Sequence, residues 1–306
     1  MTAIVFPGQG SQYVNMAMDF VENFDTALRV FEEIEDITQI NIRKIINENP
    51  NNDLNQTIFT QISIFASSLA IYKTLAKEMN YELIKPSFFL GHSLGEYTAL
   101  VASKILNIAD ASILIKKRSE LMNSAIQPNK SGMAAIIGKN AFSVEKIIKD
   151  NDLEIQIAND NSPMQVVVSG IIEEINNSQN IFLNNGVKKY VKLNVSAAFH
   201  SKFMNDAQND LINEIHKIKF NDTDQSIISN YDACINNNID LIKNALKKQM
   251  ANMVRWTESI KTLEETNTKK IIEIGPGKVL SGLISRISKK FDIISVNKVE
   301  DLNQFK

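Results

Sequence analysis

Short apolar segments alternate with helical patterns along this chain, and this alternation restricts the possible folds more than any other feature. Ile4–Phe6, Phe88–Leu90 and Ile271–Ile274 are typical of buried strands. The segment Gln61–Leu75 instead carries apolar residues at helical spacing, namely Ile62, Phe65, Leu69 and Tyr72. At 306 residues the chain is long enough for one large α/β domain or for two domains. We therefore predict an α/β fold.

The middle of the chain has a different order of elements. It predicts a strand, a helix, two strands around a turn, a helix and a strand: Met133–Ile137, Phe142–Lys149, Leu153–Ala158, Gln165–Ser169 after the turn Asn159–Pro163, Ile172–Asn185 and Val187–Val195. The last strand would place Val191, Leu193 and Val195 on one face. This β-α-β-β-α-β order is typical of a ferredoxin-like unit. We predict such a subdomain at residues 126–194, inserted into a large domain of residues 1–125 and 195–306.

Charge and composition exclude several function classes. Lys and Arg number 33 against 35 Asp and Glu, and no basic block stands out, so nucleic acid is not an expected partner. The mean hydropathy is −0.13 and no run of about eighteen apolar residues occurs, which argues against a membrane span. The single cysteine, Cys234, fits a reducing compartment, and Met1–Phe6 leads directly into a strand without a targeting leader. We expect a cytoplasmic protein.

A G-x-S-x-G motif, Gly91–Gly95, directly follows the strand Phe88–Leu90. A helix follows, with Leu94 and Tyr97 on one stripe. Strand, sharp turn and helix are the context in which this motif forms a nucleophile elbow, which would expose the hydroxyl of Ser93. The helix N-terminus would favour negative charge developing nearby. The alternative is a glycine-rich turn in which Ser93 only caps the helix.

A nucleophilic serine needs a base, and the chain has three histidines. His92 lies within the elbow, where its side chain should point away from that of Ser93. His216 lies in the predicted helix Phe203–Ile218 and is expected to be a partly packed structural residue. His200 follows a predicted strand, and open α/β sheets build their sites at the carboxyl ends of strands. Elimination and position therefore favour His200 as the base.

Two glycine-containing loops follow other predicted strands. The loop Gly8–Gln12 follows the first strand, and its backbone amides, with that of Leu94, could form an oxyanion hole. This motif is weak by itself because it matches neither the P-loop nor the dinucleotide-binding fingerprint. The loop Gly275–Gly277 precedes a predicted helix and is interpreted as a structural turn.

Arg118 is unusual because it shares a helical face with apolar residues. In the predicted helix Ala111–Met122 it lies on the stripe of Leu114 and Leu121. Burying an arginine without an anionic partner is costly. The partner is either an internal carboxylate or the carboxylate of a substrate, and the pattern leaves both open.

Taken together, these motifs resemble the malonyl-CoA:acyl carrier protein transacylases, the free-standing malonyltransferases of bacterial-type fatty acid synthesis. The resemblance runs nearly from end to end. It includes Phe6–Gln12, Gly91–Tyr97, Arg118 with Leu121-Met122, Met133–Gly138, Asn161–Pro163, Gln165–Val167, His200-Ser201, Gln249, Val254–Trp256 and Glu273–Leu280. The resemblance implies an α/β-hydrolase-like core with an inserted ferredoxin-like subdomain and the active site between them.

The resemblance also implies a role for individual residues. Ser93 would be malonylated by malonyl-CoA, with His200 as base and then acid, before transfer to the thiol of acyl carrier protein. The remaining implied site residues are the amides of Gln9 and Leu94 for the oxyanion, Arg118 for the malonyl carboxylate, Gln249 to orient the histidine, and Gln165 and Gln61 to line the pocket. No metal or cofactor is implied. Ala197 departs from the family pattern, which often has histidine there, and this weakens the argument for malonyl selectivity.

Other functions remain open at this stage. A serine hydrolase or thioesterase shares the elbow and the base, although no His-Gly-Gly-Gly oxyanion loop is evident. A trans-acting acyltransferase of a polyketide synthase and a non-enzymatic carrier-docking protein are further alternatives. Lys188 and Lys189 are candidates for docking an acidic carrier, or belong to an ordinary solvated strand end. We expect a monomer that binds neither nucleic acid nor membrane.

Overall fold

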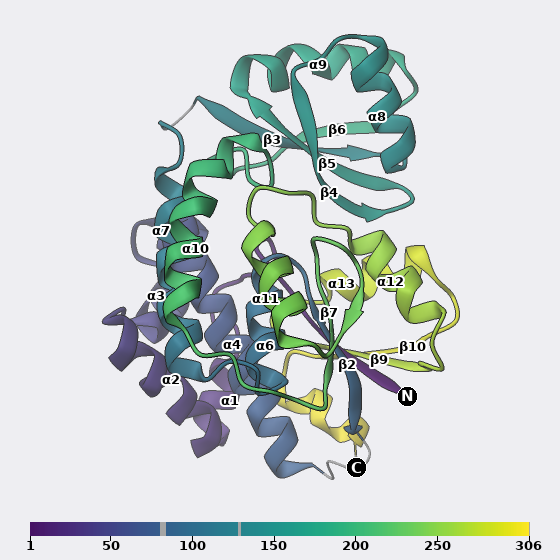
Figure 1. Cartoon of the computed structure of the whole chain (residues 1–306). Coiled ribbons are helices and arrows are strands. Elements are labelled where there is room, and N and C mark those ends of the chain that lie inside the picture. The colour runs from purple at the N-terminus through teal and green to yellow at the C-terminus, as the bar shows by residue number, and fades with distance from the viewer. Residues whose placement is uncertain (80–83, 128–129, 306) are drawn as a thin grey trace.

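The computed structural model describes residues 1–79, 84–127 and 130–305, and two β-sheets organise them. The larger sheet has six strands in the order β10-β9-β1-β2-β7-β8 (Figure 1). These strands are β1 Thr2–Phe6, β2 Pro86–Gly91, β7 Ser226–Ile228, β8 Ile235–Asn236, β9 Lys270–Ile274 and β10 Asp292–Val296. Neighbouring strands are parallel except β7 and β8, which form an antiparallel pair at one edge. The predicted strands at β1, β2 and β9 are confirmed.

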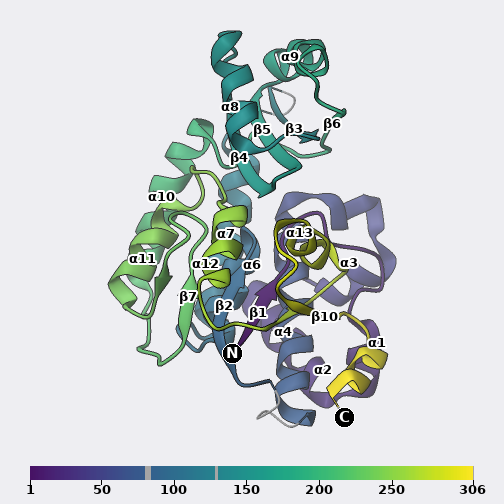
Figure 2. The ribbon, with the colours of Figure 1, turned by 90° about the vertical axis from the view of Figure 1, so that its right-hand side faces the viewer.

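Helices cover both faces of the large sheet because its central strands are apolar on both sides. Along β1, Ile4 and Phe6 face the core shared with α2, α4 and α7, whereas Ala3 and Val5 face α12 and α13. Helices α2, α4, α7, α10 and α11 share the core on the first of these faces, and Figure 2 shows α10 and α11 toward the β7 end of the sheet and α1 to α3 toward its β10 end. The helices of this part are α1 Met18–Asn23, α2 Asp25–Thr38, α3 Ile42–Glu48, α4 Thr57–Glu78, α6 Leu94–Ala102, α7 Ile108–Ser124, α10 Asn205–Lys217, α11 Ile239–Lys248, α12 Trp256–Glu264 and α13 Val279–Ile287, with 3₁₀ turns at Pro50–Asn55, Lys202–Met204 and Val299–Phe305.

Helix α4 is apolar around most of its circumference. Within the described residues it is the one helix long and apolar enough to cross a membrane by length and composition. However, 83% of its most apolar 18-residue window is buried inside the protein, where it packs against α2, α6 and α7. A helix that is hydrophobic on all sides is expected at the centre of a large core, and α4 occupies that place.

The smaller sheet has four strands in the order β4-β5-β3-β6, and each neighbouring pair is antiparallel. Its elements are β3 Ser131–Ile137, α8 Ala141–Asp150, β4 Ile155–Ser162, β5 Gln165–Ile171, α9 Ile172–Asn184 and β6 Lys189–Lys192. Alternate residues of β3 face opposite ways: Ala134 and Ile136 pack under α8 and α9, while Met133 and Ala135 face the large core. All of these elements lie within 126–194, a segment in which residues 128 and 129 fall outside the described residues.

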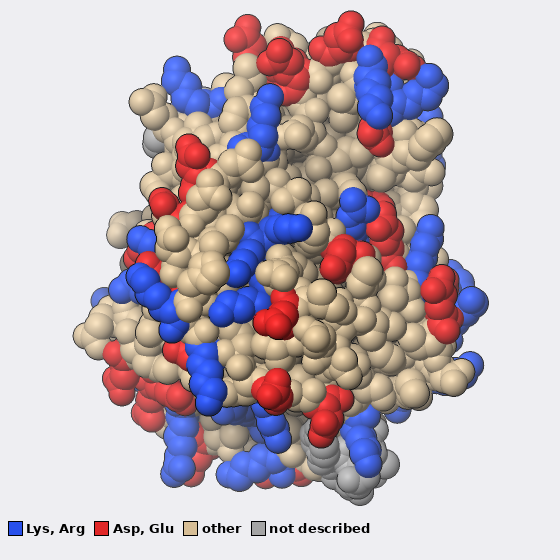
Figure 3. All heavy atoms as spheres, viewed as in Figure 1, with Lys and Arg blue, Asp and Glu red and all other residues tan. Residues whose placement is uncertain are grey.

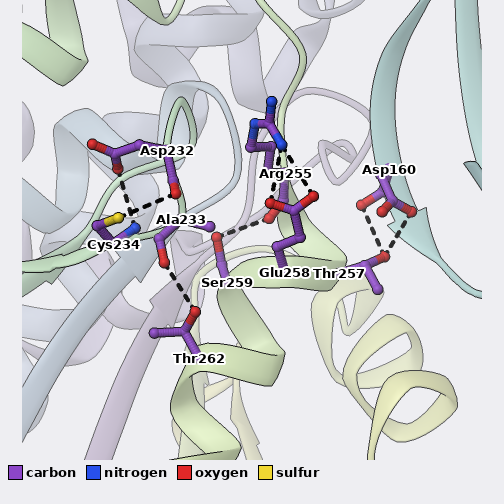
Figure 4. Close-up of polar contacts among 9 residues, drawn as sticks. All are labelled: Asp160, Asp232, Ala233, Cys234, Arg255, Thr257, Glu258, Ser259 and Thr262. Atoms are coloured by element: carbon purple, nitrogen blue, oxygen red, sulfur yellow. Dashed lines mark hydrogen bonds and ion pairs between the residues drawn. The ribbon is translucent and has the colours of Figure 1, made fainter.

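Strand β4 joins the small sheet to the rest of the protein. The backbone amide of Asp160 donates to the carbonyl of Val254 at 3.0 Å, next to an isolated bridge between Asn159 and Val254. The hydroxyl of Thr257, at the start of α12, donates to the Asp160 carboxylate at 2.7 Å (Figure 4). These polar contacts therefore connect the small sheet to the segment that leads into α12.

Two details of the predicted middle segment are wrong. The last strand covers only Lys189–Lys192, not 187–195. Val191 shares a face with Leu193 and Val195 as predicted, but it is 46% exposed. The opposite face carries Tyr190, whose hydroxyl donates to the carbonyl of Ile175 on α9 at 2.6 Å. The predicted turn at Asn159–Pro163 is also too long. Strand β4 continues to Ser162 through two irregular steps in its pairing with β5.

Candidate active site

Ser93 lies between the end of β2 and the start of α6, in a backbone conformation that only a tight turn requires. Its φ of 51° and ψ of −104° are unusual for a residue with a side chain. The turn is possible because two glycines flank it. A Cβ on Gly91 would overlap the backbone of Gly95, and one on Gly95 would overlap the carbonyl of Phe6. This strand–turn–helix geometry agrees with the predicted elbow.

Asn230, a residue that was not predicted from the sequence, holds this turn from the loop after the neighbouring strand. Its side-chain carbonyl accepts the backbone amide of Ser93 at 2.6 Å, and its amide donates to the carbonyl of Gly91 at 2.6 Å. The residue follows β7, which pairs with β2. A polar residue just after a short apolar strand was the available signal, but β7 itself was not predicted.

His200 and Ser93 are in hydrogen-bond contact, with 2.8 Å between Nε2 and Oγ. On the other side of the ring, Nδ1 lies 3.1 Å from the backbone carbonyls of both Gln249 and Asn252. Carbonyl oxygens only accept hydrogen bonds, so Nδ1 carries the proton and Nε2 is left as the acceptor facing the serine. Burial, and secondarily the positive charge of Arg118, lower the pKa of His200 to about 3. The imidazole is therefore neutral and oriented to accept a proton.

The predicted reason for the position of His200 is wrong, although the residue does reach Ser93. Strand β6 ends at Lys192 and belongs to the small antiparallel sheet, not to the open parallel sheet. The chain from Leu193 onward returns to the large core, where Ala197 and Phe199 are buried. His200 is delivered by this returning loop, with a φ of 55°.

Arg118 contributes a buried cation to the same serine. Its guanidinium is 1% exposed, and Nη2 donates to Ser93 Oγ at 2.9 Å. Nη1 donates to Gln61 Oε1 at 2.6 Å, and the group lies over the ring of Tyr97 at 5.4 Å. In the part of the chain that the structure describes, no carboxylate forms an ion pair with Arg118. The internal salt bridge that the sequence left open is therefore absent from residues 1–79, 84–127 and 130–305.

Gln249 contacts Ser93, Arg118 and His200, the histidine that the family resemblance expects it to orient. Its backbone carbonyl, not its side chain, contacts the ring of His200. The side-chain oxygen accepts Arg118 Nη2 at 3.0 Å, and Nε2 donates to the Ser93 carbonyl and to Glu96 Oε2, each at 2.8 Å. Glu96, a second residue missed from the sequence, is completely buried three positions after the serine.

A cavity of about 270 Å³ opens above Ser93 between the two sheets. Apolar side chains from the small sheet and from α13 form much of its wall, including Met133, Val167 and Leu280. The predicted site residues that line it are Gln9, Gln61, Ser93, Leu94, Arg118, Gln165 and His200. The Gly8–Gln12 loop lies against the elbow, because a Cβ on Gly8 would overlap the carbonyl of His92. Gln9 and Leu94 therefore come from adjoining loops beside the serine.

The remaining histidines and the lysine candidates have different surroundings. His92 lines the cavity, but its Nε2 is engaged with Asn161 Oδ1 at 2.8 Å. His216 is exposed on α10 and not partly packed as predicted. Lys188 and Lys189 are exposed at the start of β6, where Lys189 pairs with Ile137. Among the residues described, no group of three or more His, Cys, Asp and Glu side chains is arranged to hold a metal ion.

Comparison with known proteins gives a consistent result. Residues 3–301 match the family described as the acyl transferase domain. The chain is 35% identical over 304 residues to a malonyl CoA-acyl carrier protein transacylase of Bacillus subtilis, covering 98% of this chain and 94% of the relative.

Solved structures agree over the whole chain. An acyl carrier protein S-malonyltransferase from Vibrio cholerae superposes with a TM-score of 0.94 at 34% identity, covering 100% of this chain and 99% of the other. The malonyl-transacylase PlMCAT, solved with the type II polyketide synthase acyl carrier protein AntF, superposes with a TM-score of 0.94 at 32% identity, covering 99% and 98% of the two chains. The α/β class predicted from the sequence is confirmed.

Proposed function

The chain belongs to the acyl transferase domain family, and from this premise we propose that it transfers a malonyl group from coenzyme A to the phosphopantetheine thiol of an acyl carrier protein. One observation carries the proposal: a serine hydroxyl meets both a neutral imidazole, at 2.8 Å, and a buried guanidinium, at 2.9 Å. The first pair supplies a nucleophile and a base. The guanidinium supplies a cation with no internal carboxylate partner among the described residues, as a dicarboxylic acyl group requires.

In the first half-reaction, Ser93 Oγ attacks the thioester carbonyl carbon while its proton passes to His200 Nε2. The carbon–sulfur bond then breaks, and His200 returns the proton to the departing thiolate of coenzyme A. The product is a malonyl ester on Ser93. The hydrogen bonds from Nδ1 to the two carbonyls keep Nε2 aimed at the serine through both steps.

The tetrahedral intermediate places negative charge on the former carbonyl oxygen. We assign its stabilisation to the backbone amides of Gln9 and Leu94, which the cavity supports because both residues line it beside Ser93. Leu94 is the first residue of α6, so the positive end of that helix adds to the effect.

We assign the malonyl carboxylate to Arg118, whose planar guanidinium can bind a carboxylate through two parallel hydrogen bonds. Gln61 and Gln249 hold this guanidinium, and Gln165 lines the same cavity from the start of β5. Binding would exchange the contact between Arg118 and Ser93 for one with the acyl group. Gln249 is thus a positioning residue, through its backbone carbonyl for His200 and its side chain for Arg118.

In the second half-reaction the carrier thiol attacks the ester carbon, and His200 takes the thiol proton and returns it to Ser93 Oγ. The scheme balances without an oxidant, metal or prosthetic group, and we propose none. The carrier can belong to fatty acid synthesis or to a polyketide synthase, and the likeness to PlMCAT keeps the second source open. Hydrolysis by water at the same serine is the rival reaction.

We propose the finer architecture on the same basis. The strand order β4-β5-β3-β6 with α8 and α9 on one face supports a ferredoxin-like subdomain at 126–194. The mostly parallel sheet that bears the elbow supports an α/β-hydrolase-like core formed by 1–125 and 195–306. A cytoplasmic location remains our proposal, supported by the unpaired Cys234 and the burial of α4. A monomeric state is likewise proposed, from the sequence alone.

The decisive experiment is intact-mass analysis after mixing the protein with malonyl-CoA, acetyl-CoA or succinyl-CoA, followed by addition of holo acyl carrier protein. We expect a malonyl adduct that disappears as malonyl-carrier forms. Release of free malonate in place of carrier loading would support the hydrolase. Absence of any adduct would refute the proposal.

A further inference from the structure

Glu96 is a buried carboxylate next to the proposed site, yet it does not line the cavity. It is 0% exposed, and the residues that surround the cavity do not include it. Oε2 accepts hydrogen bonds from Gln249 Nε2 at 2.8 Å and from the backbone amide of Asn230 at 3.1 Å. Oε1 has no hydrogen-bond partner among the described residues. A buried, half-satisfied carboxylate is costly, which calls for an explanation.

Building on the proposed function, we propose that Glu96 is a positioning residue that orients Gln249 and provides the negative charge opposing Arg118 until an acyl carboxylate replaces it. The group would not touch the substrate. It would act through one glutamine side chain on the cation that binds the acyl group.

Hydrogen-bond chemistry fixes the orientation of the Gln249 side-chain amide. An ionised carboxylate only accepts hydrogen bonds, so Glu96 forces Gln249 to present its Nε2. The oxygen of the same amide must then face the other way, where it accepts Arg118 Nη2 at 3.0 Å. A reversed amide would set an oxygen against the carboxylate and an N–H group against the guanidinium. Glu96 thereby selects the amide orientation that holds Arg118 in place.

The same carboxylate oxygen supports the elbow. Asn230, whose backbone amide donates to Glu96, uses its side chain to accept the amide of Ser93 at 2.6 Å. Ser93 occupies a strained conformation that persists only when its surroundings hold it. Glu96 therefore contacts two residues that each hold one part of the site.

The groups around Arg118 leave its positive charge to be opposed by Glu96. Its hydrogen-bond partners Gln61, Gln249 and Ser93 are all neutral, so Glu96, one amide away, is the anion that faces it. The charged groups that act on Glu96 are Arg118 from α7 and Asp232 from the loop after β7. Tyr97, on the same helix as Glu96, is a further titratable neighbour. The titratable neighbours His92 and His200 have pKa values lowered by burial and are neutral.

The geometry also allows Glu96 to give up its charge. Burial raises the pKa of Glu96 to about 7, although the hydrogen bonds to Gln249 and Asn230 and the charge of Arg118 oppose this. A malonyl carboxylate on Arg118 would bring a second anion to one cation. Glu96 can then take a proton from solvent on Oε1, which leaves both hydrogen bonds to Oε2 intact.

The test compares the rates at which malonyl-CoA and acetyl-CoA acylate Ser93, by quenched mixing and intact mass, from about pH 5.5 to about pH 8.5. Their ratio cancels the titration of His200 because both donors need the same base. Below the pKa of Glu96 the guanidinium is unopposed and attracts the malonyl group more strongly. We expect the malonyl-to-acetyl ratio to fall on the order of tenfold as the pH rises through about 7. Glu96→Gln should hold the ratio high and independent of pH.

A second measurement needs no acetyl transfer. Mixing the protein with malonyl-CoA in weak buffer near pH 7 should produce proton uptake of a fraction of an equivalent per malonyl adduct. The Glu96→Gln protein should show none. Should that variant fail to fold, the pH dependence and proton uptake of the unmodified protein still decide the matter.

Glu273→Gln is the matched control. Glu273 is also a buried carboxylate, and it accepts the amides of Leu280 and Ser281 at the start of α13 at 2.9 and 2.7 Å, far from any contact with Arg118. We expect a lower melting temperature and an unchanged malonyl-to-acetyl ratio. A flat ratio in the unmodified protein, or the same pH dependence in Glu96→Gln, would overturn the inference. A wild-type protein that forms no malonyl adduct would instead refute the proposed function.

Discussion

Ser93 and His200 meet at 2.8 Å, and both have a positive φ, but the chain positions them in different ways. Ser93 stands at the junction of a strand and a helix, where Gly91 and Gly95 leave room for one sharp turn. His200 stands in an irregular loop after β6, and carbonyls from the segment after α11 hold its ring. The position of the serine is thus set locally, whereas that of the histidine depends on contacts between distant segments.

The partners of His200 Nδ1 are backbone carbonyls from this distant segment, not a carboxylate. Backbone carbonyls fix the tautomer without supplying a negative charge. Because no carboxylate among the described residues contacts the imidazole, burial and Arg118 keep the ring neutral. A site that must bind an acyl carboxylate gains from this arrangement, since a carboxylate beside the histidine would repel the substrate.

The largest expected effect comes from removing the hydroxyl of Ser93, the residue whose position is set locally. Ser93→Ala should abolish the malonyl adduct, because the attacking oxygen is gone, and should leave the melting temperature nearly unchanged. Intact mass after incubation with malonyl-CoA measures the first effect and thermal unfolding the second. A persisting adduct on the variant would show that another residue is the nucleophile.

The next largest effect comes from removing the imidazole of His200, the residue whose position depends on distant segments. His200→Ala should slow acylation and carrier loading by about two to four orders of magnitude, the usual contribution of a positioned base. His216→Ala, on the exposed face of α10, is the control and should leave both rates unchanged. Equal losses in the two variants would contradict the assignment of the base.

Arg118→Ala tests the cation shared by both halves. We expect malonyl transfer to fall steeply and the preference for malonyl over acetyl to narrow or invert, because the carboxylate loses its bidentate partner. Parallel acylation assays with the two donors give the ratio. An equal loss with both donors, together with a lower melting temperature, would mean that Arg118 is only structural.

The local origin of the elbow predicts a stability effect. Gly95→Ala should destabilise the protein by about 1–3 kcal/mol, because the added methyl overlaps the carbonyl of Phe6. Gly282→Ala is the matched control. A Cβ there meets nothing within 4 Å inside helix α13, so stability should stay the same or rise slightly. Chemical unfolding curves give the free energy of unfolding of each variant. Equal values for the two variants would contradict the prediction.

A smaller effect concerns pH. Since the pKa of His200 is lowered to about 3, the base stays neutral far below the pKa of an ordinary histidine near 6.5. We therefore expect no fall in the acylation rate between about pH 8 and about pH 5. Single-turnover rates across this range, checked against melting temperatures, would detect a fall near pH 6.5 if the ring were instead solvated.

The smallest effect lies on the strand that leads toward His200. Lys188→Glu with Lys189→Glu should raise the KM for carrier protein a few-fold and weaken its salt dependence if the carrier is acidic, as the family resemblance implies. Acylation by malonyl-CoA should not change. In Figure 3, basic side chains also gather over α11, so Lys247→Glu with Lys248→Glu is the matched control. A KM effect from the second pair alone would place docking at α11 instead.

The sequence alone predicted those features that depend on neighbouring residues. The elbow was recognisable because its glycines, serine and flanking elements are contiguous. The alternation of the last strand of the small sheet correctly put Val191, Leu193 and Val195 on one face, since Val191 pairs with Ala135 and the other two pack against the same large core. Alternation did not reveal that the strand ends at Lys192, or that the opposite face, with Tyr190 bonded to the carbonyl of Ile175 on α9, is the more buried one.

Only the tertiary structure decided how the remaining parts come together. Arg118 was recognisable because it shares a helical face with apolar residues. Its neutral partners, however, come from α4, from the turn before α6 and from the end of α11, and no sequence periodicity relates them. Glu96 and Asn230 were missed because a buried polar residue is identified by the partner that satisfies it. That partner lies more than a hundred positions away in the sequence for both residues. Hydrogen bonds of this kind depend on distances in space, which the folded core sets and the order of residues does not reveal.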